Sequence, residues 1–349
     1  MFKHSGTGNY AYMSARVKAK QSKLLKEEDY NKMLMMSVPE ISHYISEAGY
    51  SKEMNDLGNR YEGIELLEYA TYMNMSKQFR SILESANGEL KDMVSAYLTK
   101  WDFENLKVVL RGRTYGLSLD QMREDLVLAG SLREDDMERL LAAPSIEDAL
   151  AIFKNKTGLS VSDVAVHAYK ENRVLTMIED EITKGYYKNV LESITGKDRA
   201  TNVFRTYMKY VIDLKNIETI MKFKMENIEG ELAADFFIPG GYQLNQKIYT
   251  QAMAAPTVEA AFNELQSMKI YEELKTVLSQ TNTISLLILS MERIRLQMAI
   301  QVAHMYPLSV IPVVVYMIMK EDEVKKIRTV AHGIDSGLDR DTIKNLLVI

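Results

Sequence analysis

The side chains best suited to bind another molecule are basic residues that recur near the ends of three similar segments. Lys222 and Lys224 follow Arg111 and Arg113 by 111 positions, and His332 follows Lys222 by 110 positions. One interpretation is structural, because cations favour the negative C-terminal end of a helix dipole. The other is a pseudo-symmetric ring of cations that face a common axis and bind an acidic partner.

A second group of basic residues lies near the N-terminus, where a helix is expected over residues 9–28. Arg16 and Lys20 are the members that we expect to contact a partner. A solvated cationic face is one interpretation, and a surface for an acidic protein or for anionic lipid headgroups is the other. Within residues 9–28, five basic residues precede the first acidic residue, Glu27: Arg16, Lys18, Lys20, Lys23 and Lys26.

Motifs for catalysis, nucleotide binding or metal binding are missing from the sequence. Gly196-Lys197 does not form a phosphate-binding loop, because Leu191 stands where that loop needs a glycine. There is no cysteine, and none of the 5 histidines has a second histidine at helical spacing as a metal-binding partner. We therefore expect no catalytic residue, no metal site and no cofactor.

Carboxylates are abundant but grouped in short acidic runs. Each run is expected near the start of a helix, where negative charge favours the helix dipole. A helix-capping role is therefore expected rather than acid–base chemistry. The three runs are 27–29, 134–136 and 321–323.

The elements that position the recurrent cations are predicted to be three copies of one helix. Asp102, Asp213 and Glu323 open the copies, and each copy carries four apolar residues spaced to share one helix face. Each helix is predicted to end at a residue that tolerates the left-handed conformation, namely Gly116, Asn227 and Gly337. The twelve apolar residues are Phe103, Leu106, Val109 and Leu110; Leu214, Ile217, Ile220 and Met221; and Val324, Ile327, Val330 and Ala331.

This period predicts a chain built by triplication of a unit of about 110 residues. Pro144 and Pro256, each before a helix-capping residue, share the period. Short second helices are expected over residues 120–128 and 339–347. The predicted helical domains are residues 1–128, with a polar tail over 1–8, then 129–240 and 241–349.

Composition favours an all-α protein. The 349 residues include only 6 prolines and 17 glycines, and 46% are hydrophobic. A net charge of −5 argues against general nucleic-acid binding. The apolar segment Pro307–Met319 has 13 residues, whereas a membrane-spanning helix needs about 20. It is predicted to be a buried core helix, and no segment is expected to span a membrane.

Six motifs follow one another along the chain: Tyr10-x-Tyr12-x-x-Ala15-Arg16, Asp102-x-x-Asn105-Leu106-Lys107, Asp213-x-x-Asn216-Ile217, Phe237-Ile238-Pro239-Gly240-Gly241, Pro307-x-Ser309-x-x-Pro312 and Gly333-x-x-x-Gly337-Leu338. In this order they resemble the C subunit of the archaeal A-type ATP synthase, a relative of the d subunit of V-type ATPases. The resemblance covers about Tyr10 to Leu347. One departure is Lys326, where relatives commonly have asparagine.

The resemblance implies three similar helical domains arranged as a funnel with pseudo-threefold symmetry. It implies a non-catalytic rotor subunit that links the D and F subunits of the central stalk to the membrane proteolipid ring and transmits torque. Such a subunit would lie at the cytoplasmic face of the membrane and would bind neither nucleotide nor nucleic acid.

Two alternatives come from other classes. One is a generic α-helical repeat scaffold for soluble partners, although its repeats are commonly about 34–47 residues long. The other is a helical enzyme whose site is assembled from scattered carboxylates.

Overall fold

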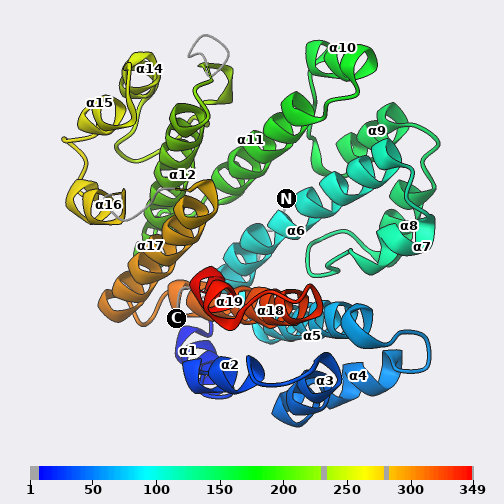
Figure 1. Ribbon diagram of the computed structural model, residues 1–349. Coiled ribbons are helices and arrows are strands. Elements are labelled where there is room, and N and C mark those ends of the chain that lie inside the picture. The colour runs from blue at the N-terminus through cyan, green and yellow to red at the C-terminus, as the bar shows by residue number, and fades with distance from the viewer. Residues whose placement is uncertain (1–7, 229–233, 279–282, 348–349) are drawn as a thin grey trace. The chain divides into compact units, whose positions relative to one another are not determined.

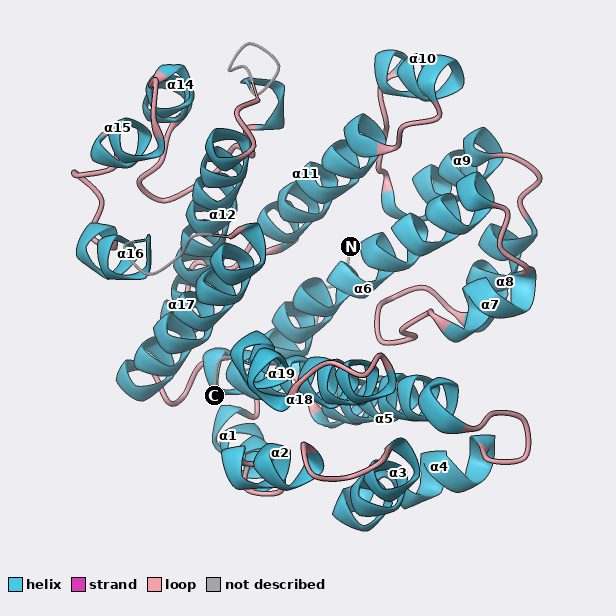
Figure 2. Ribbon diagram, viewed as in Figure 1, coloured by secondary structure: helices cyan, strands magenta, loops and turns pink. Residues whose placement is uncertain are grey.

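The structure, a computed structural model, describes residues 8–228, 234–278 and 283–347. Within these ranges the chain forms helices joined by loops and contains no strand (Figure 2). The predicted all-α class is therefore confirmed. Of the predicted polar tail over residues 1–8, only Gly8 lies within the described residues.

The chain divides into two compact bodies. The larger body joins Phe2–Ile182 to Val313–Ile349, and the smaller body is Thr183–Pro312. Helix α11 (Thr176–Ser193) contributes residues to both. This division describes packing, and the three sequence domains predicted above stay a prediction.

The larger body contains the N-terminal helices together with the last two helices of the chain (Figure 1). Its helices are α1 (Tyr10–Gln21), α2 (Glu27–Met33), α3 (Val38–Ile45), the π-helical turn Ser46–Tyr50, α4 (Ser51–Leu57), α5 (Gly63–Ser85), α6 (Gly88–Tyr115), α7 (Leu119–Glu124), α8 (Glu134–Ala142), α9 (Ile146–Thr157), α10 (Asp163–Asn172), α18 (Ile311–Asp335) and α19 (Arg340–Leu347).

The smaller body is built around two long helices, α12 and α17, which pack against each other. Its core joins apolar residues of α12 to those of the short helices that follow, including Tyr249 and Phe262. Its elements are α12 (Arg199–Met225), the 3₁₀ turn Ala234–Phe236, α14 (Gln246–Ala254), α15 (Val258–Asn263), α16 (Tyr271–Leu278) and α17 (Ile284–Met305).

The three copies of the predicted helix form the C-terminal parts of α6, α12 and α18. All twelve apolar residues that were predicted to share a buried face are buried. Leu106, Ile217 and Ile327, at the centre of the three faces, are fully inaccessible to solvent. The periodic pattern therefore placed the correct face inside in every copy.

The predicted helix ends are also confirmed. Gly116, Asn227 and Gly337 have φ angles of 73°, 55° and 69°. The next residue then donates its backbone N–H to the carbonyl five positions earlier, as from Leu117 to Gly112 at 2.8 Å and from Leu338 to Gly333 at 2.9 Å. Asn227 is followed by the same bond, from Ile228 to Phe223 at 2.9 Å. Each end is thus a Schellman motif.

Some predicted helix bounds were wrong. The helix expected over residues 9–28 ends at Gln21, and α2 starts only at Glu27. Between them, the backbone N–H of Leu25 donates to Glu323, so tertiary contact favours a turn there. The helix expected over 120–128 is α7, which ends at Glu124.

One core of the larger body is shared between the two ends of the sequence. Tyr30, Met33 and Ile41 pack in one cluster with Ile327 and Ile343. Figure 1 shows this arrangement as the red helices α18 and α19 beside the blue helices α2, α3 and α5. The first and last segments of the chain therefore complete one hydrophobic core.

The apolar segment Pro307–Met319 behaves mostly as predicted. Leu308 is exposed, whereas residues 309–318 are buried. The helix itself starts at Ile311. Within the described residues, no helix is both long and apolar enough to cross a bilayer.

Candidate functional site

The first residue of each repeated helix segment is a buried carboxylate that binds a distant loop. Asp102, 1% exposed, accepts hydrogen bonds from the backbone N–H groups of Ser131 at 2.7 Å and Leu132 at 3.1 Å. The Ser131 hydroxyl donates to it at 2.7 Å. Gly130 leaves room for this contact, because a Cβ there would lie 2.0 Å from Asp102 Oδ1. Asp102 thus fixes the chain as it enters α8.

Asp213 has the same role in the smaller body. It accepts backbone N–H groups from Tyr242 at 3.0 Å, Gln243 at 2.8 Å and Leu244 at 3.1 Å. Gly241 is the equivalent of Gly130 here, because a Cβ on it would lie 2.1 Å from Asp213 Oδ1. Burial raises the pKa of Asp213 to about 6, while the three N–H donors act in the opposite direction.

Glu323 is the equivalent carboxylate in the third copy, and it contacts the opposite end of the chain. Its Oε2 accepts the backbone N–H of Leu25 at 2.7 Å. Leu25, Leu132 and Leu244 each stand directly before the N-cap residue of a short helix, α2, α8 and α14. The three carboxylates therefore hold equivalent loops, and the third loop lies almost three hundred residues away in sequence.

A second contact recurs in two copies only. Asn105 donates to the carbonyl of Val127 at 2.9 Å and accepts its N–H at 2.9 Å. Asn216 makes the same pair of bonds to Ile238, both at 2.8 Å. The third equivalent is Lys326, whose ammonium instead lies 2.9 Å from Asp322 and over the Tyr30 ring. The position that would match Val127 is residue 348, outside the described residues.

A buried ionic cluster around Glu323 was not foreseen from the sequence. The acidic run 321–323 was predicted near a helix start, but it lies in the middle of α18. Lys320 Nζ lies 2.6 Å from Glu323 and donates to the Tyr50 hydroxyl at 2.8 Å, and both charged side chains are almost fully buried. Burial lowers the pKa of Lys320, and Glu323 acts against that shift. The sequence feature that could have indicated this ion pair is the i, i+3 spacing of Lys320 and Glu323.

The first basic residue at each repeated helix end, equivalent to Arg111, contacts a carboxylate within the protein. The Arg111 guanidinium forms two parallel bonds with Glu179, at 2.6 and 2.7 Å, while its side chain stays 53% exposed. Lys222 lies 2.5 Å from Glu218 in its own helix. His332, the third equivalent, lies 2.8 Å from Glu68. Each cation has a carboxylate partner, and Arg111 offers the most exposed surface.

The second basic residue of each pair, Arg113 or Lys224, caps the end of a neighbouring helix. Arg113 donates to the carbonyl of Leu141, in the last turn of α8. Lys224 donates to the carbonyls of Met253 at 2.5 Å and Ala255 at 2.6 Å, at the end of α14. These bonds satisfy carbonyls that have no partner within their helix. Arg113 and Lys224 therefore position the short helices against α6 and α12.

Arg16 and Lys20, the other two predicted contact residues, lie on α1 beside α5. Arg16 donates to the hydroxyls of Ser81 at 3.1 Å and Tyr12 at 3.3 Å. Lys20 donates to the Gln78 side-chain carbonyl at 2.5 Å. Both cations therefore bind neutral oxygens, in contrast to Arg111 and Lys222.

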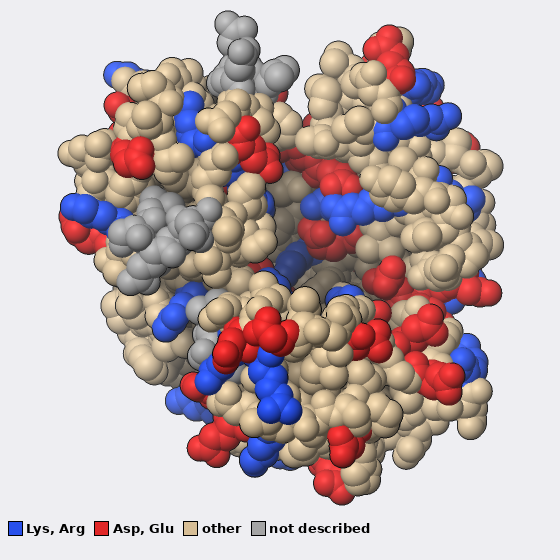
Figure 3. All heavy atoms as spheres, viewed as in Figure 1, with Lys and Arg blue, Asp and Glu red and all other residues tan. Residues whose placement is uncertain are grey.

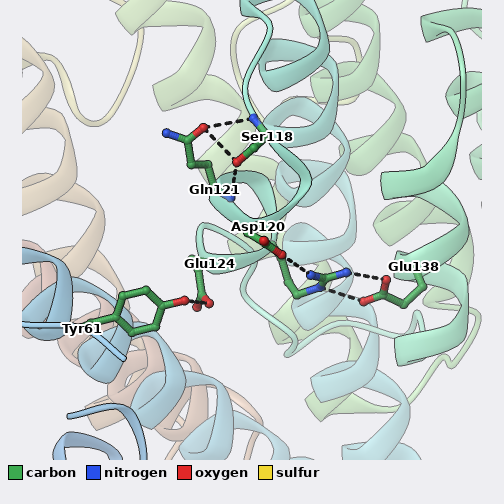
Figure 4. Close-up of polar contacts among 7 residues, drawn as sticks. Tyr61, Ser118, Asp120, Gln121, Glu124 and Glu138 are labelled. Carbon is green, nitrogen blue, oxygen red and sulfur yellow. Dashed lines mark hydrogen bonds and ion pairs between the residues drawn. The ribbon is translucent and has the colours of Figure 1, made fainter. Parts of the chain in front are cut away.

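The segment after α6 is held by a polar network (Figure 4). Ser118 and Gln121 form a capping box at the start of α7. The Arg123 guanidinium bridges Asp120 at 2.8 Å and Glu138 of α8 at 2.9 Å. Glu124, the last residue of α7, accepts a hydrogen bond from the Tyr61 hydroxyl. That bond raises the pKa of Tyr61 to about 12.

This network fixes a short exposed apolar segment at the end of α6. Tyr115 is 77% exposed, and Leu117 and Leu119 also keep much of their surface in solvent. Leu338, the third-copy equivalent of Leu117, is exposed as well. The ends of two repeated helices thus present apolar side chains on a rigid support.

The surface charges show no extended patch of one sign on the face drawn in Figure 3, where basic and acidic side chains are interspersed. Among the described residues, no group of three or more His, Asp or Glu side chains is arranged to hold a metal ion. The features that stand out are therefore contacts that fix helices and exposed helix ends.

Three repeated helix segments, each bound through a buried carboxylate to a loop, define an all-α protein of the helical-repeat class. The profile of the ATP synthase (C/AC39) subunit family matches residues 13–346. The chain belongs to this family.

Three relatives illustrate the match, and each is named as the C subunit of an A-type ATP synthase. The chain is 31% identical to the protein of Haloferax volcanii, with 99% of both chains covered. It is 34% identical to that of Haloquadratum walsbyi, over 96% of this chain and 97% of the relative. It is 30% identical to that of Methanosarcina acetivorans, over 99% of this chain and 95% of the relative.

Proposed function

We propose that this protein is the non-catalytic adaptor of the rotor in an A-type ATP synthase. It joins the central stalk, formed by the D and F subunits, to the membrane proteolipid ring and passes torque between them. It acts as a peripheral protein at the cytoplasmic face of the membrane and needs no cofactor. The observation that carries this proposal is the family match over residues 13–346, nearly the whole chain.

The internal contacts support a part that must transmit force. Long helices whose buried faces are mainly apolar resist bending because cores pack at crystal-like density. The carboxylates Asp102, Asp213 and Glu323 add hydrogen bonds that tie each long helix to a loop distant in sequence. Torque applied at one helix would therefore reach its neighbours without rearrangement of a loop.

Contact with the stalk or the ring is proposed for the recurrent cations. Arg111 is the best placed of them, because half of its side chain is exposed while Glu179 holds its orientation. Lys222 is about 30% exposed, and Arg113 and Lys224 can contribute only the donors that helix capping leaves over. On α1, Arg16 and Lys20 remain further candidates.

Affinity purification from native membranes tests the adaptor role. The tagged chain is expected to bring down both stalk subunits and the proteolipid ring. Recovery of neither would exclude the adaptor, and recovery of soluble proteins alone would favour the generic scaffold.

A charge reversal tests the contact residue. Arg111→Glu is expected to weaken binding of purified stalk about tenfold or more, since interface arginines are frequent hot spots. Arg123→Glu is the matched control, because Arg123 is also nearly half exposed and also bridges carboxylates. Equal losses in both variants would remove Arg111 from the interface.

A further inference from the structure

Helix α1 and the turn after it carry a stripe of cations without acidic neighbours. Arg16, Lys20 and Lys23 follow one another at i, i+4 and i+7, a spacing that places them on one side of a helix. The bond from the Lys23 N–H to the Lys20 carbonyl, at 3.1 Å, continues the helical winding past Gln21. We call Arg16, Lys20 and Lys23 the cationic stripe. From Asn9 to Lys26 the chain contains five basic residues and no acidic one, whereas its overall net charge is −5.

The structure leaves the charges of the stripe uncompensated. In the ranges that the structure describes, no carboxylate lies within 4.0 Å of the basic nitrogens of the stripe. The partners supplied by α5 are the neutral oxygens of Ser81 and Gln78. Elsewhere Arg111 and Lys222 are ion-paired, whereas Arg113 and Lys224, like the stripe, donate to neutral oxygens. The stripe differs from Arg113 and Lys224 because three such cations follow one another on one side of a helix.

The environment of the stripe adds positive potential. Arg16, Lys23 and the buried Lys320 all lie close enough to Lys20 to lower its pKa, after the larger effect of burial. Such a cluster gains most from a partner that brings negative charge and hydrogen-bond acceptors together.

We propose that the cationic stripe binds the anionic headgroups of a membrane surface. The stripe lies along α1 and the turn after it, and Lys23 is exposed on a flexible stem. Tyr12, one turn before Arg16 on the same side, is 54% exposed, and tyrosine is enriched at membrane–water interfaces. The outer face of α1 adds exposed small residues, Ala15 and Ala19, which allow close approach.

An anionic leaflet suits this stripe better than a single acidic protein. A protein would have to offer several carboxylates at positions matched to three side chains, whereas a leaflet presents negative charge at every point. Basic residues near an anionic leaflet each add about 1 kcal/mol to binding. The proposal does not depend on the adaptor role, because lipid alone is the partner.

Vesicle flotation with the full-length protein tests the proposal. Vesicles in which about a third of the lipid is phosphatidylglycerol, and the rest phosphatidylcholine, are expected to carry the protein upward. Pure phosphatidylcholine vesicles are not. Binding should weaken as KCl is raised, because salt screens exposed charges. Failure of the wild-type protein to bind anionic vesicles at low salt would overturn the proposal.

Neutralising variants locate the binding surface. Arg16→Gln/Lys20→Gln/Lys23→Gln is expected to lower the partition coefficient about a hundredfold. The control Lys52→Gln/Lys154→Gln/Lys170→Gln removes the same charge from exposed positions on α4, α9 and α10, and should change it by less than about threefold. Equal losses in the two variants would mean non-specific adhesion and would overturn the proposal.

A protein partner is the competing outcome. If the stripe variant loses binding to detergent-purified synthase subunits but floats with anionic vesicles like the wild type, the stripe is a protein interface and the lipid proposal is wrong. Circular dichroism thermal melts that match the wild type are needed for both variants. A destabilised triple variant is replaced by Lys20→Gln/Lys23→Gln, with an expected loss of about twentyfold to thirtyfold.

Discussion

Asp102 on α6 and Glu323 on α18 make the same contact in different ways. Asp102 binds a loop about thirty residues further along the chain and uses only hydrogen bonds. Glu323 binds the loop at Leu25, at the other end of the sequence, and carries a buried ion pair with Lys320 and a bond from the Tyr50 hydroxyl at 2.6 Å. One position in the repeat thus closes a local loop in one copy and joins the two ends of the chain in another.

The difference has a physical reason. A loop that follows in sequence is already close, so a short aspartate and a glycine beside it complete the contact. In the third copy, the loop that Glu323 holds comes from the N-terminal segment, at Leu25. A longer glutamate, supported by Lys320 and Tyr50, provides the extra hydrogen bonds that hold two distant segments.

The largest effect is expected from Glu323→Gln. The change keeps the volume but leaves the buried Lys320 without its counter-ion, so the free energy of unfolding of the larger body should fall by about 3–5 kcal/mol in urea denaturation. The control Lys326→Ala, at a partly exposed ion pair one turn away, should cost about 1 kcal/mol or less. Similar small costs for both would show that the buried pair does not join the chain ends.

A pH titration tests the raised pKa of Asp213, the buried carboxylate of the second copy. The pKa of Asp213 is about 6 in the folded protein, above its ordinary value of 3.8. The folded state therefore binds more protons than the unfolded state in this window, and stability should fall as pH rises from about 4 to 6. The contribution of Asp213 amounts to at most about 3 kcal/mol.

Urea denaturation of the wild type and Asp213→Asn across this window measures that contribution. The asparagine variant cannot titrate, so its stability should fall less with pH than that of the wild type. Parallel curves would contradict the raised pKa, and a wild-type stability that rises relative to the variant would reverse its sign.

A smaller effect should separate the asparagine contacts from their lysine counterpart. Asn105→Ala and Asn216→Ala each leave a buried backbone N–H and carbonyl without a partner, so each should cost about 2 kcal/mol. Hydrogen exchange should then increase at the Val127 amide in the first variant and at the Ile238 amide in the second. Unchanged protection of these amides would show that the two bonds do not fix the loops.

Sequence reasoning recovered the repeated parts of the fold because they obey local rules. Helix periodicity placed Leu106, Ile217 and Ile327 inside, and the tolerance of Gly116, Asn227 and Gly337 for positive φ located the helix ends. The candidate contact residues were harder to interpret. A cation near a helix end can cap a carbonyl, as Arg113 does, or pair with an acid, as Arg111 does, and spacing alone does not distinguish the two.

The sequence by itself determined the helical class, the period, the buried faces and the family. Only the tertiary structure decided that Leu25 and Glu323 meet, that Lys320 is buried beside Glu323, and that the helix begun at Tyr10 ends at Gln21. The reason is that helix periodicity and capping depend on residues within a few turns. Contacts between the two ends of a chain depend on how the complete set of helices packs, and no local pattern encodes them.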